Sequence, residues 1–342
     1  MQRQCGLVLT AMILAACNGG SIPYSAPLWI AASTASQRSK TADLYVSNFG
    51  NGTITVYAVG SAKLSRTIAK GLTKPGGLGF DRAGNLYALN STPSGPVLVY
   101  ALGSTSVLRT ISAGINTPVA LGFDAADNLY VANAGANTVT VYAPGRTSVS
   151  RTISKGLGYP NWITFDAAGN LYVPNLGGKS VTVYAKGSGS VLRTITQGLI
   201  KPYQSAIDRS GNLYVSNCGK DCGVKPASGN IVVYAPGSST VSRTITKGID
   251  NPGAMAFDRA GNLYIANYNS DAVTVYAPGS STVLRKITAG LHVPGALAFD
   301  AKGDLYVGSQ KGNVTVYAPG SATLLRTISK GQKTPIAIAV GP

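Results

Sequence analysis

Short apolar runs alternate with clusters of turn-forming residues along most of this chain. In residues 252–290 four such runs follow one another, each only four to six residues long. Asp258 opens the turn after the first run, and Gly261 supplies a position that tolerates positive φ in the same turn. Runs this short lack the longer periodicity of a helix, so the pattern predicts four strands, at 253–257, 263–266, 272–277 and 282–287. The runs are almost continuously apolar, which is typical of strands packed on both faces.

This unit, whose strands we label a, b, c and d in chain order, repeats along the sequence. Three markers recur in the same order in every copy: Leu-Tyr in strand b, Val-Tyr in strand c, and Arg-Thr-Ile or Arg-Lys-Ile in strand d. The leucines of the first marker are Leu44, Leu86, Leu129, Leu171, Leu213, Leu263 and Leu305. The period is 42 or 43 residues, except for one copy of 50. Seven copies of a four-stranded unit of this length predict a β-propeller.

The two ends of the repeat region complement each other. The first copy begins at strand b, with Asp43-Leu44-Tyr45, and no strand a precedes it. Residues 335–340 read as a strand a with no further strands after it. We therefore expect an all-β domain over residues 43–342. It is a seven-bladed β-propeller of four-stranded antiparallel blades, and its C-terminal strand joins the first blade and closes the ring.

The repeat resembles that of NHL-type β-propellers. The resemblance rests on the pattern Pro-x-x-x-x-Phe-Asp-x-x-Gly-Asn-Leu-Tyr-Val-x-Asn followed by Val-x-Val-Tyr, and it covers residues 43–340. It implies the fold and leaves the function open, because this architecture occurs in both enzymes and binding proteins.

Residues 1–16 are typical of a lipoprotein signal peptide. Arg3 precedes an apolar run at 7–14 that is too short to span a bilayer. The run ends in Leu-Ala-Ala-Cys17, which resembles the lipobox of bacterial lipoproteins and implies that Cys17 is lipidated and becomes the mature N-terminus. The alternative is an ordinary signal peptide followed by a chance cysteine. On the first interpretation, residues 17–42 are the lipidated cysteine and a Ser-, Ala- and Gly-rich tether.

Export and anchoring have two further consequences. We expect the protein in the bacterial cell envelope, and in the outer membrane where a cell has two, because Asn18 is not the aspartate retention signal. Outside the reducing cytoplasm, Cys218 and Cys222 are expected to form a local disulfide. A metal site is the alternative for this pair, but it needs further ligands, and the chain has a single histidine.

Candidate catalytic chemistry is scarce. The chain has no glutamate, and six of its twelve acidic residues occupy the repeated a–b turn. Gluconolactonase-like and streptogramin-lyase-like propellers, to which the fold is similar, use glutamate in their metal sites, and amidating-lyase-type propellers bind zinc through several histidines. We therefore expect no catalytic residues, no metal and no cofactor. The alternative is a hydrolase or lyase with an atypical site, which would need Asp250 or Asp271 close to His292.

Charge suggests a second kind of partner. The 29 basic and 12 acidic residues give a formal net charge of +17. Seven arginines are the strand-d markers, which are interpreted either as protection of the outer sheet edges or as a source of non-specific attraction to polyanions. No known nucleic-acid-binding motif appears, so we expect no specific binding of nucleic acid.

A candidate ligand surface follows from sequence variation among the copies. The d–a and b–c connections lie at one end of each blade, and they vary, whereas the a–b and c–d turns at the other end are nearly uniform. A recognition surface needs such differences, and aromatic groups suit sugar rings or a protein hot spot. The candidate ligand-binding residues are Tyr159, Asn161, Trp162, Tyr203, Gln204, Asp250 and Asn251. In the alternative, Trp162 and Tyr203 only fill the central channel. We expect a monomer that acts as a binding or scaffolding module for a protein or glycan ligand.

Overall fold

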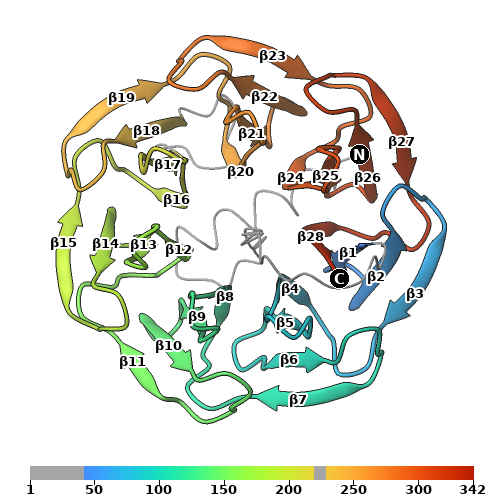
Figure 1. Cartoon of the computed structure of the whole chain (residues 1–342), viewed down its shortest axis with the longest axis horizontal. Coiled ribbons are helices and arrows are strands. Elements are labelled where there is room, and N and C mark those ends of the chain that lie inside the picture. The colour runs from blue at the N-terminus through green and yellow to red at the C-terminus, as the bar shows by residue number, and fades with distance from the viewer. Residues whose placement is uncertain (1–41, 219–228) are drawn as a thin grey trace, which may run out of the picture.

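The computed structural model describes residues 42–218 and 229–342, and it confirms the predicted architecture. The described residues form 28 strands in seven four-stranded antiparallel sheets, arranged as blades around a central axis (Figure 1). No helix of these residues is long and apolar enough to cross a membrane.

Strand a is the innermost strand of every blade. Six of these seven strands begin with a proline. Proline has no backbone N–H to donate to a neighbouring strand, so it is tolerated at the first residue of a strand. These strands are β4 (Pro75–Phe80), β8 (Pro118–Phe123), β12 (Thr164–Phe165), β16 (Pro202–Ile207), β20 (Pro252–Phe257), β24 (Pro294–Phe299) and β28 (Pro335–Gly341). The exception is β12, which is only two residues long, although Pro160 still forms an isolated bridge to Asn175.

Strands b and c form the buried middle of each blade. Nearly every residue in them is buried, because neighbouring blades cover both faces of the sheet. The b strands are β1 (Asp43–Asn48), β5 (Leu86–Asn90), β9 (Leu129–Asn133), β13 (Leu171–Asn175), β17 (Leu213–Asn217), β21 (Leu263–Asn267) and β25 (Leu305–Ser309). The c strands are β2 (Thr53–Ala58), β6 (Val97–Tyr100), β10 (Thr138–Tyr142), β14 (Ser180–Tyr184), β18 (Asn230–Tyr234), β22 (Ala272–Tyr276) and β26 (Asn313–Tyr317).

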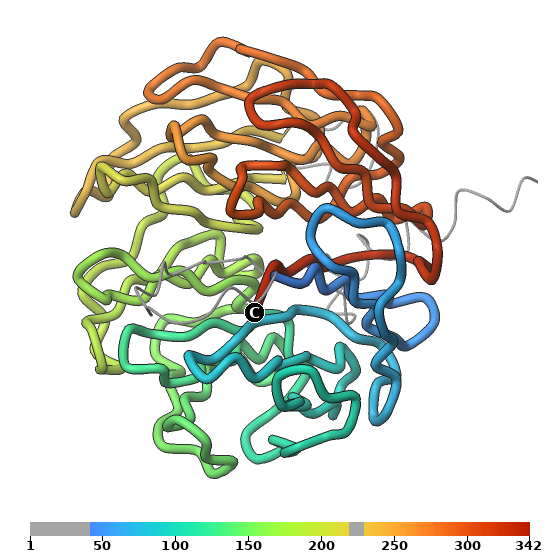
Figure 2. Tube along the Cα trace, turned by 45° about the vertical axis from the view of Figure 1, so that its right-hand side comes forward, coloured from blue at the N-terminus to red at the C-terminus, as the bar shows by residue number. Residues whose placement is uncertain are grey.

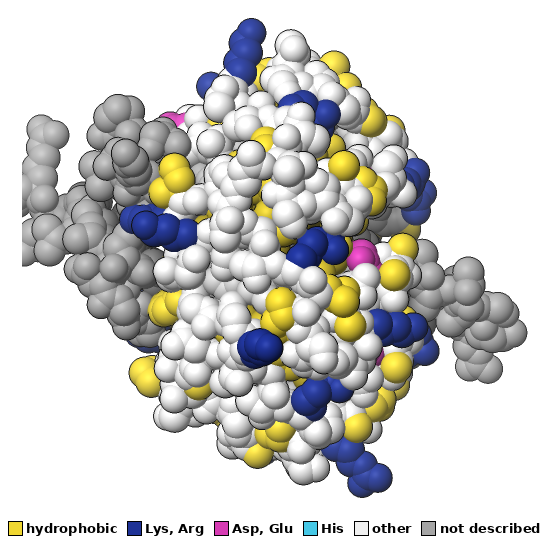
Figure 3. Space-filling view, turned by 90° about the vertical axis from the view of Figure 1, so that its left-hand side faces the viewer, with side chains coloured by type: hydrophobic (Ala, Val, Ile, Leu, Met, Phe, Trp, Pro, Cys, Tyr) yellow, Lys and Arg dark blue, Asp and Glu magenta, His cyan; other side chains and the backbone are white. Residues whose placement is uncertain are grey.

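Strand d is the outer edge of each blade, and its side chains alternate between half-buried and exposed. The d strands are β3 (Leu64–Ile68), β7 (Val107–Ile111), β11 (Arg151–Ile153), β15 (Val191–Ile195), β19 (Val241–Ile245), β23 (Val283–Ile287) and β27 (Leu324–Ile328). Figure 3 shows the side of the ring, where Lys and Arg side chains are spread singly among uncharged atoms.

The hydrophobic core is divided among the seven junctions between blades. Each core cluster combines residues of two adjacent sheets, such as Val56 of the first blade with Leu78 and Leu98 of the second. At five junctions the strand-b tyrosine of one blade meets the strand-a phenylalanine of the next edge-to-face, with ring centroids 5.0–5.2 Å apart. Burial of apolar area at these junctions is the main force that holds the blades side by side.

The ring closes as predicted, by pairing of the C-terminal strand with the first blade. β28 pairs with β1 in antiparallel register, with Leu44 opposite Val340 and Val46 opposite Ile338. Figure 2 shows the red C-terminal strand lying beside the blue N-terminal one. The first blade is thus built from both ends of the described chain, and pairing removes the edges that β1 and β28 would each leave open.

The strand-d arginines are tied into their own blades. Six of the seven donate inward to the hydroxyl of the strand-b tyrosine, as Arg66 does to Tyr45 (2.7 Å) and Arg193 does to Tyr172 (2.9 Å). These arginines therefore belong to hydrogen-bond networks inside the blades. That role is more specific than edge protection, and it directs one nitrogen of these guanidinium groups into the blade.

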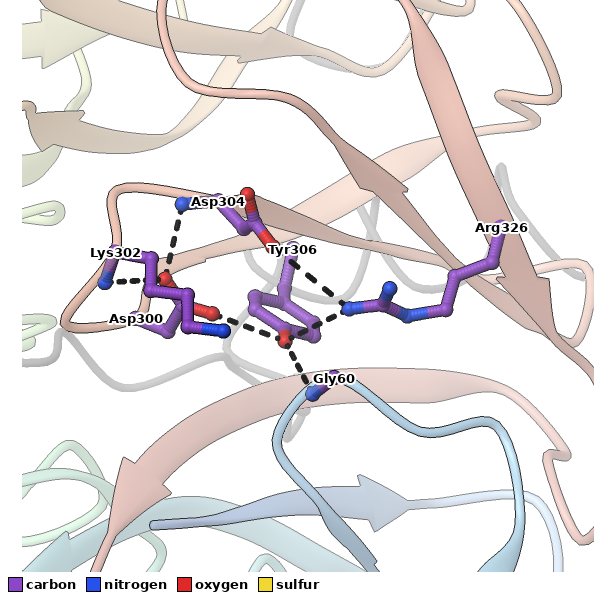
Figure 4. A network of polar contacts seen from close by, with 6 residues as sticks. All are labelled: Gly60, Asp300, Lys302, Asp304, Tyr306 and Arg326. Atoms are coloured by element: carbon purple, nitrogen blue, oxygen red, sulfur yellow. Dashed lines mark hydrogen bonds and ion pairs between the residues drawn. The ribbon is translucent and has the colours of Figure 1, made fainter. Parts of the chain in front are cut away.

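The seventh blade shows the complete network (Figure 4). The Tyr306 hydroxyl donates to Asp300 Oδ2 (3.2 Å) and accepts from Arg326 (3.3 Å). It also accepts from the backbone N–H of Gly60 (3.4 Å), which lies in the c–d turn of the first blade. Asp300 in turn accepts the backbone N–H groups of Lys302 and Asp304, as expected for an aspartate in a tight turn. One tyrosine therefore joins a turn, an edge strand and the neighbouring blade.

Candidate functional site

The d–a and b–c connections lie side by side on one end of the ring, which we call the variable face. The first residue after strand b donates its backbone N–H to the carbonyl of the residue that precedes the proline of the d–a segment of the same blade, which is Pro160 in the fourth blade and the first residue of strand a in the others. The donor–acceptor pairs, at 2.8–3.2 Å, are Phe49–Thr334, Ser91–Lys74, Ala134–Thr117, Leu176–Tyr159, Cys218–Lys201, Tyr268–Asn251 and Gln310–Val293. The predicted grouping of these two sets of connections on one face is therefore observed.

A buried polar residue at the end of strand b supports each d–a connection from below. In six blades an asparagine Oδ1 accepts a backbone N–H from that connection, as Asn133 does from Asn116 (3.1 Å) and Asn267 does from Asp250 (3.0 Å). In the seventh blade Ser309 Oγ accepts from His292 (3.3 Å). The asparagine of the repeat is therefore structural, and it holds a loop whose remaining side chains are free to vary.

Two of the predicted site residues lie beneath the variable face instead of on it. Asn161 and Trp162 are 0% and 2% exposed. Asn161 Nδ2 donates to the Tyr203 carbonyl (2.8 Å), and Trp162 Nε1 donates to the Ser205 carbonyl (3.1 Å). These bonds to the next blade coincide with the shortened strand β12. Both side chains thus act in the junction between blades four and five.

Gln204 and Asn251 are also buried. Gln204 Oε1 accepts the backbone N–H of Met255 in the sixth blade (2.6 Å). Asn251 Oδ1 lies 3.0 Å from the sulfur of Cys218, which takes part in a disulfide. The predicted partner of that sulfur, Cys222, lies outside the described residues, so the pairing remains a prediction. These residues form the wall beneath the candidate surface.

The remaining predicted residues, Tyr159, Tyr203 and Asp250, are half-buried on the variable face. Tyr203 is joined by two residues that the sequence analysis did not select. Its hydroxyl interacts with that of Tyr268, and the Tyr268 hydroxyl lies beside Gln310 Nε2, because both are within 3.3 Å of the position that a Cβ on Gly295 would take. Burial raises the pKa of both tyrosines, so both remain neutral well above neutral pH. Tyr203, Tyr268 and Gln310 form a continuous group across blades five to seven.

Two glycines make room for this group. A Cβ on Gly253 would lie 2.3 Å from the Tyr268 ring, and one on Gly295 would lie 3.1 Å from the Tyr268 hydroxyl. The ring therefore rests on the backbone at the start of β20 and points toward β24. Any larger residue at position 253 would displace it. A signal for Tyr268 was present in the sequence, because it occupies the variable position directly after strand b.

Three buried amide atoms near this group have no hydrogen-bond partner among the described residues. They are Asn161 Oδ1, Asn251 Nδ2 and Asn269 Nδ2. Buried polar atoms are rarely left unpaired, since each costs about 1–3 kcal/mol. Asn161 belongs to the fourth blade and Asn251 and Asn269 to the sixth, and all three atoms are shielded from solvent.

The acid–base pair that an atypical enzyme would need is not assembled among the described residues. His292 is exposed, and no hydrogen bond or ion pair joins its ring to Asp250 or Asp271. Asp271 Oδ1 instead accepts the backbone N–H of Val293 (2.6 Å), which holds the d–a connection. Within residues 42–218 and 229–342, no three His, Cys, Asp or Glu side chains are close enough together to hold a metal ion.

Comparison with known proteins identifies the fold alone. No protein-family model and no curated protein matches the sequence. A candidate 6-phosphogluconolactonase from Bacteroides fragilis has a similar structure, with a TM-score of 0.71 and 14% identity over 90% of this chain and 99% of that one. The hydrazine synthase of Kuenenia stuttgartiensis aligns with a TM-score of 0.68 and 16% identity, over 86% and 99% of the two chains. The computationally designed Ika8 protein aligns with a TM-score of 0.65 and 18% identity, over 89% and 91%.

Proposed function

We propose that this protein is a non-enzymatic, envelope-anchored propeller that binds a glycan through its variable face. The observation that carries the proposal is the Tyr203–Tyr268–Gln310 group, which lies on the variable face and extends across three adjacent blades. Aromatic rings supply flat apolar area for sugar faces, and the tyrosine hydroxyls and amides supply hydrogen-bonding groups for sugar hydroxyls.

The rigid support beneath this surface favours binding. Asn161, Trp162 and Gln204 hold the inner strands of blades four, five and six to one another through side chain–backbone hydrogen bonds. A surface held in one arrangement loses less conformational entropy when a ligand binds. The polar residues of strand a thus serve the site indirectly, by fixing the positions of Tyr203 and its neighbours.

A hydrolase is the second candidate, because two structures of similar fold carry the description of candidate 6-phosphogluconolactonases. Identities of 14% and 12% do not extend that activity to this chain. Hydrolysis of a six-membered lactone by the purified protein, abolished by the paired change His292→Ala and Asp271→Asn, would establish this candidate in place of the binding module.

The binding proposal is tested with an array of neutral and acidic oligosaccharides and the full chain. Binding of the best oligosaccharide should weaken at least tenfold in the double variant Tyr203→Ala, Tyr268→Ala, because stacking aromatics typically contribute 1.4 kcal/mol or more at binding hot spots. Phe49→Ala is the matched control, since Phe49 occupies the position of Tyr268 in the first blade and is also half-buried. Equal affinity in the double variant and the control, both folded, would show that the sector is not the site.

A further inference from the structure

The charged residues of this protein segregate by face. In the described part of the chain, the d–a and b–c connections contain nine lysines, no arginine and two aspartates. Nine minus two gives the variable face a formal charge of +7. The lysines are Lys70, Lys74, Lys155, Lys179, Lys201, Lys247, Lys311, Lys330 and Lys333, and the aspartates are Asp250 and Asp271.

The opposite face is nearly balanced. The described a–b and c–d turns, with Asp43 beside them, carry seven basic residues and nine aspartates, a formal charge of −2. The strand-d arginines lie on the rim between the two faces, and six of the seven donate to tyrosine hydroxyls within their blades. The excess positive charge that faces solvent at one end of the ring therefore comes from lysine alone.

Eight of these nine lysines are available to a partner. Eight of the nine are exposed, the exception being Lys201, and the two ion pairs formed among the described residues involve none of the eight. Lys74 Nζ lies 5.3 Å from the centroid of the Phe49 ring, a cation–π contact that leaves the ammonium group at the surface. Unpaired like charges on one face repel each other, and a polyanion would relieve that repulsion.

The residue type narrows the class of polyanion. Arginine binds phosphate and carboxylate alike in a planar, bidentate manner and is the preferred residue for recognition of nucleic acids, and it is absent from the described part of this face. Lysine offers a point charge on a flexible stem, which suits anionic groups spaced along a flexible polymer and needs no fixed bidentate geometry.

From these observations we infer that the glycan ligand is a polyanionic polysaccharide. Its charged groups contact the lysines around the ring, and its hydroxyl-bearing rings contact the Tyr203–Tyr268–Gln310 group. This inference rests on the proposed function, since it assigns a ligand class to the same face.

The test uses polygalacturonate as the probe and methyl-esterified polygalacturonate as its neutral match. The full chain should bind the first and not the second, and affinity should fall as salt is raised. A variant with Lys74, Lys179, Lys311 and Lys333 changed to Gln should bind polygalacturonate about tenfold more weakly, since each exposed pair contributes little alone. The matched control changes Lys63, Arg146, Lys186 and Lys302, four exposed cations of the opposite face, to Gln and should retain the affinity.

Several outcomes would overturn the inference. Equal losses in the two quadruple variants would show that only net charge matters. Equal binding of the esterified polymer would show that carboxylates are not recognised. Tighter, lysine-dependent binding of single-stranded DNA or of phosphatidylglycerol vesicles would assign the face to another polyanion. A neutral oligosaccharide whose binding depends on Tyr203 and Tyr268 but not on the lysines would refute the inference and leave the proposed function standing.

Discussion

At the scale of single residues, the strand-b tyrosine connects parts of the molecule that are distant in sequence. Tyr130, for example, donates to Asp124 in the a–b turn and accepts from Arg151 on the outer strand. Its ring packs edge-to-face on Phe165 of the next blade. In the third, fourth and seventh blades the repeated Asp, Tyr and Arg therefore form one hydrogen-bonded unit.

Removing one hydroxyl from such a unit should lower stability measurably. Tyr306→Phe leaves the ring in place but deprives Asp300, Arg326 and the Gly60 N–H of a shared partner. We expect the free energy of unfolding to fall by about 1–3 kcal/mol, measured by denaturant titration. Thr327→Val, an exposed change on the same outer strand, is the control and should alter it by less than about 0.5 kcal/mol. A Tyr306→Phe protein as stable as the control would contradict this role.

At the scale of elements, strand c contributes a second series of buried tyrosines that acts at the other end of the blade. Their hydroxyls donate to backbone carbonyls of the preceding d–a connection, as Tyr100 does to Lys70 (2.7 Å) and Tyr184 does to Lys155 (2.6 Å). The tyrosines of strand b thus stabilise the uniform turns, and the tyrosines of strand c stabilise the connections of the variable face. Burial raises the pKa of Tyr130 and of Tyr184 to about 12.

These shifts predict a loss of stability in alkaline solution. The folded protein holds tyrosine in its neutral form, and the unfolded chain ionises it near the ordinary value of 10. The stabilisation from neutral tyrosine is therefore complete below about pH 10 and is lost as the pH rises through about 12. Unfolding followed by circular dichroism and phenolate absorbance should show both signals changing together above pH 10. Full ionisation near pH 10 with the strand signal intact would contradict this expectation.

At the scale of the whole molecule, ring closure determines how the domain is presented. The first described residue, Ala42, lies on the uniform face, where its carbonyl accepts the Val59 N–H of the c–d turn (2.9 Å). The chain thus enters the ring on the face opposite the lysines. If residues 17–42 tether the domain to a membrane, as the sequence predicts, the tether joins the ring on the face opposite the lysines.

The anchor itself gives a prediction at this scale. The apolar run before Cys17 lies outside the described residues, so the proposal rests on the lipobox-like sequence alone. Cys17→Ala should move the exported protein from the detergent phase to the aqueous phase on phase separation, because the acyl chains supply the membrane affinity. Cys218→Ala, which keeps the lipobox, should leave the partition unchanged. Detergent partition of the Cys17→Ala protein equal to that of the unaltered chain would exclude a lipid anchor at this residue.

Much of the architecture was determined by the sequence alone. Period, strand count and the incomplete first and last copies predict seven blades and their closure, because a repeated unit can bury its two faces only against its own copies. The face that carries the variable connections is also predictable, since strand direction in a meander assigns each turn to one end.

Only the tertiary structure decided which residues of that face are surface and which are support. Asn161, Trp162 and Gln204 vary between copies as ligand-binding residues would, yet their side chains turn into the junctions with the next blade. Tyr268 and Gln310 meet Tyr203 only because three blades converge at the axis. Variation between the copies shows that the repeated fold does not require one residue type at a position. The packing between separate blades determines where the side chain at that position lies.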